Sequence, residues 1–143
     1  MRVMAVDYGD ARTGVAVSDI SKTLVGEAFI VQSKIMKETS RQIADEAKKR
    51  EVSCIVVGYP KNMDGSIGAR AEKSEKLVDF LRSDLAALDL INVEVKLWDE
   101  RLTTASAHKV LDDVGKYGKK RKQTVDAVAA ALILEGYLPL LST

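Results

Sequence analysis

The chain opens with Arg2-Val3-Met4-Ala5-Val6-Asp7-Tyr8-Gly9, and this stretch decides how the rest of the sequence can fold. A continuous apolar run is typical of a strand that is covered on both faces, so we expect a central strand here. An aspartate at the end of such a strand lies where open α/β sheets bind their ligands. Gly9 has no side chain and would let a phosphate or a metal ion come close. The alternative is that Asp7 only starts a turn, as aspartate often does.

The order of the predicted elements indicates a mixed sheet. Two apolar runs joined by the short polar loop 9–14 predict a β-hairpin. Further along, the sequence predicts strands over 24–31, 53–58 and 93–98, and helices over 37–50, 71–88, Thr103 or Thr104 to about Val114, and about 124–137. In this order the first hairpin is antiparallel and the later strands run parallel to the first strand through right-handed crossovers. The predicted fold class is α/β: a ribonuclease H-like fold with a five-stranded mixed sheet flanked by helices, in one domain spanning 1–143.

Composition excludes several classes of protein. The 143 residues are 46% hydrophobic with a net charge of +1, which excludes a disordered or histone-like chain but leaves room for a local basic patch that binds nucleic acid. Cys54 is the only cysteine, so we expect no internal disulfide and a cytoplasmic location. No apolar run approaches the roughly 20 residues that span a bilayer, and a signal-peptide pattern is missing. We expect no membrane association.

Glu100 is the second candidate site residue. It follows the strand predicted over 93–98, so it should lie on the same edge of the sheet as Asp7. The alternative is that Glu100 serves only the dipole of the following helix and an ion pair with Arg101.

Asp126 is the third candidate. It belongs to the first turn of the apolar helix predicted over 124–137, and it shares one helix face with Ala130 and Ile133. A carboxylate on a core-facing stripe needs a partner, and no Lys or Arg lies nearby on that stripe. A bound cation is the simplest partner. The alternative is a first-turn aspartate that interacts only with the helix dipole.

Together, Asp7, Glu100 and Asp126 form a donor set suited to a hard cation. Carboxylate oxygens are the ligands that Mg²⁺ and Mn²⁺ prefer. Two such ions about 3.5–4 Å apart can activate a water and stabilise the leaving oxygen of a phosphodiester. We therefore expect these three residues to be both metal ligands and catalytic residues. His108 has no Cys or His partner at metal-binding spacing, and Cys54 falls in a predicted buried strand. Neither residue is therefore an alternative candidate for the metal or catalytic site.

Basic residues gather around the proposed acidic site. Lys116 and the basic residues after it crowd the loop that leads to Asp126, and three more cations come from loops expected on the same edge of the sheet. A basic run is most often a solvated loop, but next to an acidic metal site it would bind phosphates. Few aromatic residues are free to stack on bases, which favours recognition of backbone and shape. The candidate nucleic-acid-binding residues are Arg12, Lys61, Arg70, Arg101, Lys119, Lys120, Arg121 and Lys122.

Several segments of the sequence resemble the YqgF/RuvX family, in order and over nearly the whole chain. They are Asp7-Tyr8-Gly9 with the segment 12–19, the segment 57–66 (Val-Gly-Tyr-Pro-Lys-Asn-Met-Asp-Gly-Ser), Asp99-Glu100-Arg101-Leu102-Thr103-Thr104, and Lys120-Arg121-Lys122 with Asp126 and Ala129-Ala130.

The resemblance implies a ribonuclease H-like fold in which Asp7, Glu100 and Asp126 are the metal-binding acids. Members are described as Holliday-junction resolvases or as nucleases that mature the 5′ end of the small-subunit ribosomal RNA precursor. Two departures matter: Lys61 replaces the usual apolar residue after the proline, and the strand that ends at Gly58 carries no acid, although related resolvases place one there. The missing acid bears on the number of metal ions.

The sequence favours a Mg²⁺- or Mn²⁺-dependent nuclease acting on structured RNA, foremost a ribosomal RNA precursor, or on branched DNA. Ribosomal particles are further expected partners. The alternatives are a Holliday junction resolvase and a non-catalytic assembly factor that binds ribosomal RNA or ribosomal proteins. A relative of the actin and sugar-kinase ATPases would need two such domains, and this chain has room for one. A two-fold junction would suit a homodimer, yet no helix shows a spare apolar face, so monomer and homodimer both stay open.

Overall fold

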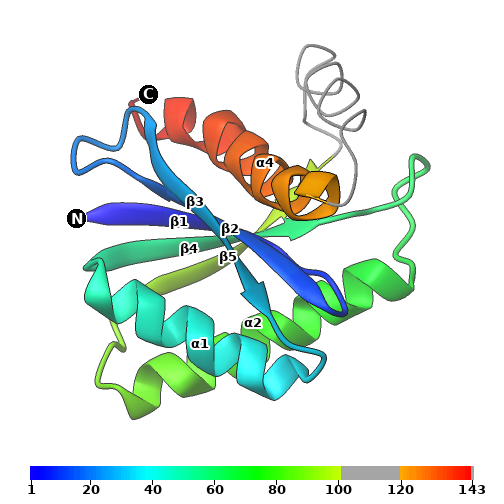
Figure 1. The fold of residues 1–143 in the computed structure, drawn as a ribbon, viewed down its shortest axis with the longest axis horizontal. Helices are drawn as coiled ribbons and strands as arrows, with labels where there is room; N and C mark the ends of the chain where they lie inside the picture. The colour runs from blue at the N-terminus through cyan, green and yellow to red at the C-terminus, as the bar shows by residue number, and fades with distance from the viewer. Residues whose placement is uncertain (101–119, 143) are drawn as a thin grey trace.

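The computed structural model describes residues 1–100 and 120–142, with the backbone alone for 120–126 and 142. A five-stranded sheet in the order β3-β2-β1-β4-β5 runs through the middle of the molecule (Figure 1). Its strands are β1 (Arg2–Asp7), β2 (Arg12–Ser18), β3 (Val25–Gln32), β4 (Val52–Tyr59) and β5 (Glu94–Asp99). The predicted mixed sheet is confirmed, and β1 is its central strand.

Strand directions bring three strand ends to one edge of the sheet. β1 pairs antiparallel with β2, with Asp7 opposite Gly14, and it pairs parallel with β4. β4 in turn pairs parallel with β5, with Gly58 opposite Trp98. The carboxyl ends of β1, β4 and β5 therefore meet, and we refer to this edge as the carboxyl edge.

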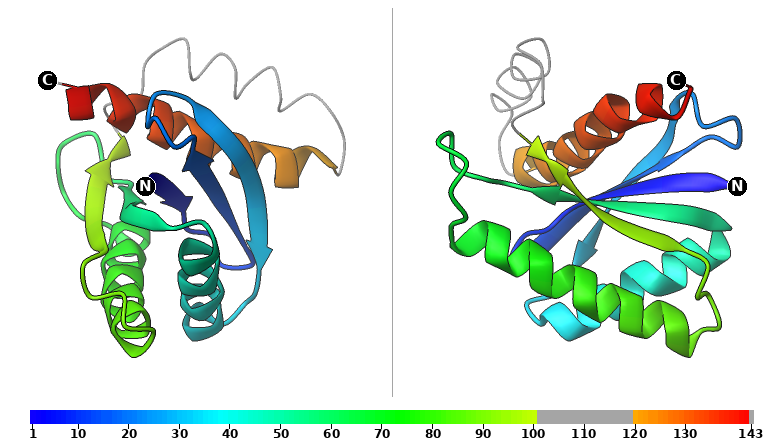
Figure 2. Two further views of the ribbon diagram at one scale, coloured as in Figure 1. Left: turned by 90° about the vertical axis from the view of Figure 1, so that its left-hand side faces the viewer. Right: turned by 180° about the vertical axis from the view of Figure 1, so that it is seen from behind.

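Helices cover both faces of the sheet. Helices α1 (Met36–Lys49) and α2 (Ala69–Ala87) lie on one face, while α4 (Lys120–Tyr137) lies on the other and is followed by the 3₁₀ helix η2 (Leu138–Ser142) (Figures 1 and 2). The residues of β1 alternate between the two cores: Met4 and Val6 pack on the side of α1 and α2, and Val3 and Ala5 pack on the side of α4. Burial on both faces explains why β1 is apolar without interruption.

The sequence misplaced the start of the last helix. α4 begins at Lys120 rather than near Thr124, so Lys120, Arg121 and Lys122 form its first turn instead of a loop. Lysine, arginine and glutamine have helix propensities close to that of alanine, so the basic run extends the helix that the apolar residues predict. The helix predicted from Thr103 or Thr104 to about Val114 lies outside the described residues.

Two cations also lie on regular elements rather than on the loops predicted for them. Arg12 is the first residue of β2, and Arg70 lies in the first turn of α2. Lys61 does lie in the loop after β4, as expected. None of the helices in the described part of the chain is long and apolar enough to cross a membrane.

Candidate functional site at the carboxyl edge

Asp7 and Glu100 meet at the carboxyl edge. Asp7 is the last residue of β1, Glu100 directly follows β5, and β4 lies between these two strands. A hydrogen bond joins the two side chains. The structure thus brings together two of the three acids that the sequence selected, although β1 and β5 are not neighbours in the sheet.

Gly58 makes this meeting sterically possible. A Cβ atom on Gly58 would lie 2.6 Å from Glu100 Oε1 and 2.8 Å from Ile133 Cδ1, which is closer than van der Waals contact allows. The carboxyl group of Glu100, the residue after β5, therefore fills the space next to Gly58. A residue with a side chain at position 58 would collide with this carboxyl group.

The two carboxyl groups share an unfavourable environment. Burial raises the pKa of Glu100 above its ordinary value, with a smaller contribution from the neighbouring charge of Asp99. The positive charge of Arg70 and the hydrogen bond with Asp7 oppose this rise without cancelling it. A hydrogen bond between two carboxyl groups needs a proton on one of them, so this contact and the burial of Glu100 both disfavour full ionisation of the pair. A divalent cation would replace that proton.

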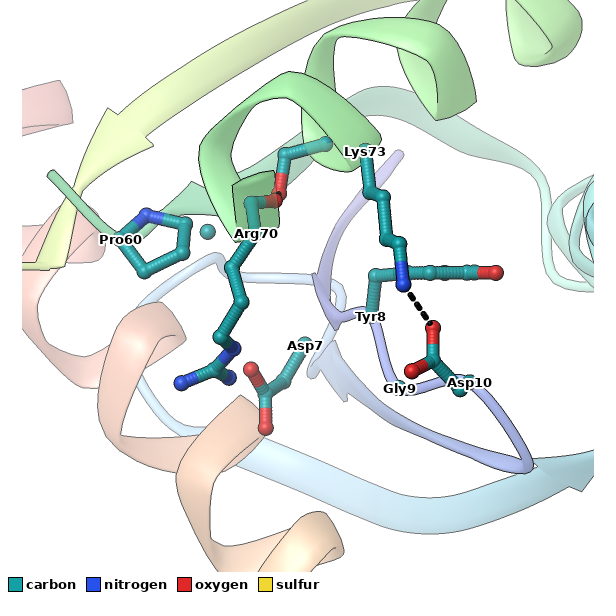
Figure 3. Close-up of a pocket in the computed structure, with 9 residues that line it drawn as sticks. Asp7, Tyr8, Gly9, Asp10, Pro60, Arg70 and Lys73 are labelled. Atoms are coloured by element: carbon teal, nitrogen blue, oxygen red, sulfur yellow. Dashed lines mark hydrogen bonds and ion pairs between the residues drawn. The ribbon is translucent and has the colours of Figure 1, made fainter. Parts of the chain in front are cut away.

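A cavity of about 110 Å³ opens beside the carboxyl pair. Its walls come from the end of β1, the β1–β2 connection, the end of β4 and the start of α2 (Figure 3). Arg70 extends from α2 with its guanidinium group pointing toward the carboxyl group of Asp7 (Figure 3). Lys73, on the next turn of α2, binds Asp10 of the β1–β2 connection with an Nζ–Oδ1 distance of 2.7 Å.

Two more of the predicted nucleic-acid-binding residues, Arg12 and Lys61, lie at the same edge. Arg12 begins β2 at the end of the strand near Asp7, because β1 and β2 are antiparallel. The Nζ atom of Lys61 lies 5.4 Å from the ring centroid of Tyr59, a cation–π arrangement that holds the side chain next to the end of β4. Arg12, Lys61 and Arg70 thus lie on segments that begin or end at the carboxyl edge, and their binding of nucleic acid stays a prediction.

For Asp126 the structure describes only the backbone. Asp126 lies within α4, and the two residues predicted to share its face, Ala130 and Ile133, are buried against the sheet. The side chains that lie outside the described part are those of Asp126, Arg101, Lys119, Lys120, Arg121 and Lys122. Among the residues whose side chains are described, no three His, Cys, Asp or Glu form a group that could hold a metal ion. Of the three predicted acids, the structure thus describes the side chains of Asp7 and Glu100, and for Asp126 it gives only the position in α4.

Sequence reasoning missed Lys73, Asp10 and the role of Gly58. Lys73 follows Arg70 by three residues at a helix start, and this spacing was the available signal for a second cation on the same face. Nothing in the sequence pairs Lys73 with Asp10, because the contact joins two segments that only the fold brings together. Cys54 is buried as expected, and burial raises the pKa of its thiol, which agrees with an unreactive residue.

Comparisons with known proteins agree with this arrangement. Residues 1–139 match the family model RuvX, described as "Holliday junction resolvase". A protein of Halothermothrix orenii named "Putative pre-16S rRNA nuclease" is 47% identical over 139 residues, which are 96% of this chain and 94% of the relative. A protein of Acetivibrio thermocellus with the same name is 38% identical and covers 96% of this chain and 95% of its own length.

Solved structures of resolvases share the fold. RuvC of Thermus thermophilus, solved with a Holliday junction substrate, superposes with a TM-score of 0.58 at 17% identity and covers 98% of this chain and 96% of its own. The fowlpox virus Holliday junction resolvase gives a TM-score of 0.54 at 16% identity, with 99% of both chains covered. This likeness confirms the predicted ribonuclease H-like fold, and with the match over residues 1–139 it follows that the chain belongs to the RuvX family, a family of nucleases.

Proposed function

We propose that this protein is a divalent-metal-dependent nuclease that cleaves phosphodiester bonds of a ribosomal RNA precursor. The observation that carries the proposal is the pair of hydrogen-bonded carboxyl groups, Asp7 and Glu100, at the carboxyl edge of a ribonuclease H-like sheet. Its relatives, named as nucleases of pre-16S ribosomal RNA, support this substrate. Such a substrate would place the protein in the cytoplasm, with ribosomal particles as partners.

The residues present fit a hard cation. Asp7 and Glu100 offer only oxygen atoms, and a cation would offset the cost of ionising two carboxyl groups that lie close together. Asp126 would complete the donor set from the first half of α4. Mg²⁺ or Mn²⁺ is the expected ion, and when bound it would supply an activated water and charge stabilisation for the leaving oxygen.

The remaining residues of the site would position the nucleic acid. Arg70 and Lys61, together with Arg12, present positive charge around the carboxyl edge and would bind backbone phosphates. Lys120, Arg121 and Lys122 would extend this surface from the first turn of α4, and Arg101 and Lys119 from the segment that precedes it. These contacts carry no sequence information, so the shape of the substrate would determine where it is cut.

The second candidate substrate is a Holliday junction. The description of the family model favours it. A junction has two-fold symmetry, so resolution would require a homodimer that places one carboxyl pair at each of two strands. The oligomeric state with and without a four-way DNA junction therefore separates the two substrates.

Cleavage assays with Mn²⁺ test the proposal. A transcript of the 16S ribosomal RNA precursor and a four-way DNA junction are each incubated with wild type, Asp7→Asn and the control Asp45→Asn, which changes an exposed acid on α1. We expect Asp7→Asn to lower cleavage at least a hundredfold, whereas Asp45→Asn keeps wild-type activity. Equal cleavage by wild type and Asp7→Asn would refute the assignment. Tight binding of the RNA with no cleavage by wild type, and no Mn²⁺ binding in calorimetry, would favour the non-catalytic assembly factor instead.

A further inference from the structure

The ion pair between Lys73 and Asp10 lies at the mouth of the cavity beside the carboxyl pair. The Nζ atom of Lys73 lies 2.7 Å from Asp10 Oδ1, and both residues line the cavity with Arg70 and Asp7 (Figure 3). Lys73 and Arg70 come from consecutive turns of α2, so two cations face one cavity. The negative charge of Asp10 repels phosphate, so its position beside two cations would weaken the binding of nucleic acid.

The pair is poised to open. The side chain of Asp10 is 75% exposed and that of Lys73 is 44% exposed, so water screens their attraction and the contact adds little to stability. Asp10 belongs to the connection between β1 and β2, where its side chain can turn toward solvent. A phosphate that carries more charge and more acceptor oxygens than a single carboxylate would compete well for the lysine.

The cavity suits a phosphate group. Its volume of about 110 Å³ has room for several water molecules, so a phosphate could enter without displacing the surrounding side chains. The start of α2 contributes as well, because its N-cap is Gly68, which makes no side-chain capping hydrogen bond. The backbone N–H groups of the first turn and the helix dipole therefore add positive potential next to Arg70.

We propose that Lys73 and Arg70 bind a backbone phosphate of the nucleic-acid strand that approaches the carboxyl pair. Without nucleic acid, Lys73 forms its ion pair with Asp10, and the phosphate displaces Asp10 when it binds. The inference rests on the proposed function, because it takes nucleic acid as the ligand. Lys73 is then a binding residue, and Asp10 is a positioning residue that lowers affinity and favours strands able to displace it.

Binding without metal tests the proposal separately from cleavage. The affinity of a fluorescently labelled 16S-precursor RNA fragment is measured by fluorescence polarisation in EDTA at several salt concentrations. The variants are Lys73→Gln, Lys73→Arg, Asp10→Asn and the double variant that combines Lys73→Gln with Asp10→Asn. Lys48→Gln is the matched control. Lys48 lies near the C-terminus of α1 and lines a different cavity, beside Met1 and the start of β4 at the opposite edge of the sheet.

We expect Lys73→Gln to weaken binding roughly threefold to tenfold and to lower the slope of affinity against salt by about one phosphate contact. Lys73→Arg should keep most of the affinity. Asp10→Asn should tighten binding, and this gain should vanish in the double variant, because Asp10 acts through Lys73. Lys48→Gln should leave the slope unchanged.

Two outcomes would overturn the proposal. In the first, Lys73→Gln and Lys48→Gln give the same affinity and the same salt slope. In the second, Asp10→Asn tightens binding equally in the presence and absence of Lys73, which would mean a general charge effect. Either result leaves the nuclease assignment standing if wild type still cleaves in an Asp7-dependent manner. The effect of Lys73→Gln on RNA binding can also be measured if wild type does not cleave, so failure of the nuclease assignment would not hide the result.

Discussion

Asp7 and Glu100 are hydrogen-bonded to each other across the end of β4, and Gly58 leaves the space that the Glu100 carboxyl group fills. Like charges at this separation repel, and burial adds to the cost of ionising both groups. Burial therefore holds the pKa of Glu100 above that of an ordinary surface glutamate. This contact underlies the expected binding of a cation, the pH dependence of that binding and the effect of a side chain at position 58.

Binding of Mn²⁺ should strengthen as pH rises. The cation needs both carboxyl groups ionised, and burial holds the pKa of Glu100 above its ordinary value of 4.5. Metal binding must then compete with protonation of Glu100 at a higher pH than for a free glutamate, so affinity should keep increasing with pH above the range in which a free glutamate titrates. Isothermal titration calorimetry in buffers of different ionisation enthalpy measures both the affinity and the proton released. Glu100→Gln should abolish the proton release, and wild-type affinity that does not change above pH 5 would contradict the prediction.

Without metal, Glu100→Gln should stabilise the protein at neutral pH. A carboxyl group whose folded pKa is raised binds its proton more tightly in the folded state, so its effect on stability becomes less favourable as pH rises above the unfolded pKa. Glutamine keeps the hydrogen-bonding capacity and cannot ionise. We expect a gain of about 0.5–2 kcal/mol in EDTA at pH 7 that shrinks toward pH 4. Urea unfolding at both pH values measures it, and a loss of stability at pH 7 would show that the ionised glutamate is favourably partnered.

Gly58→Ala should disable the site while leaving the fold intact. The added Cβ would meet Glu100 Oε1 at 2.6 Å and Ile133 Cδ1 at 2.8 Å, and the side chain of Glu100 is the more easily displaced. We expect Mn²⁺ affinity and cleavage to fall at least tenfold, with a loss of about 1–3 kcal/mol in stability from crowding in the core. Gly136→Ala in α4 is the matched control, because its added Cβ would lie 3.8 Å from the Trp98 ring and would favour the helix. Equal activity of the two variants would argue against the Gly58–Glu100 contact.

Arg50 should stabilise the fold far from the site. Its guanidinium group donates to both carboxylate oxygens of Glu27, at 3.0 Å from Nε and 2.8 Å from Nη2, forms an ion pair with Glu46, and stacks 4.6 Å from the ring centroid of Phe29. Lysine cannot reproduce this planar set of contacts. Arg50→Lys should therefore cost about 1 kcal/mol without changing cleavage, while Lys49→Gln, at a side chain 71% exposed, should be neutral.

The Arg50 contribution should depend on pH in the opposite sense to that of Glu100. The hydrogen bond with Arg50 lowers the pKa of Glu27 below its ordinary 4.5. The stabilisation is complete above that ordinary value and is lost as pH falls through the lower folded pKa. The difference in unfolding free energy between wild type and Arg50→Lys should thus shrink between pH 5 and pH 3, and a difference that grows on acidification would contradict this account.

Much of the fold could be predicted because the signals are local. The uninterrupted apolar run from Val3 to Val6 indicates a strand with helices on both sides, and the hairpin that follows it limits the sheet to a mixed arrangement. The start of α4 was predicted wrongly because basic residues with high helix propensity look the same in a loop and in a first turn. The metal-binding roles of Asp7, Glu100 and Asp126 stay predictions.

The sequence by itself determined that one strand ends at Asp7 and that another ends just before Glu100, because the side-chain pattern indicates strands. That was enough to place Asp7 and Glu100 on one edge of the sheet. Only the tertiary structure decided that their carboxyl groups touch, that Gly58 makes room for them, and that Asp10 holds Lys73 beside them. These contacts join segments distant in the chain, and their distances depend on sheet order and twist rather than on any local pattern of residues.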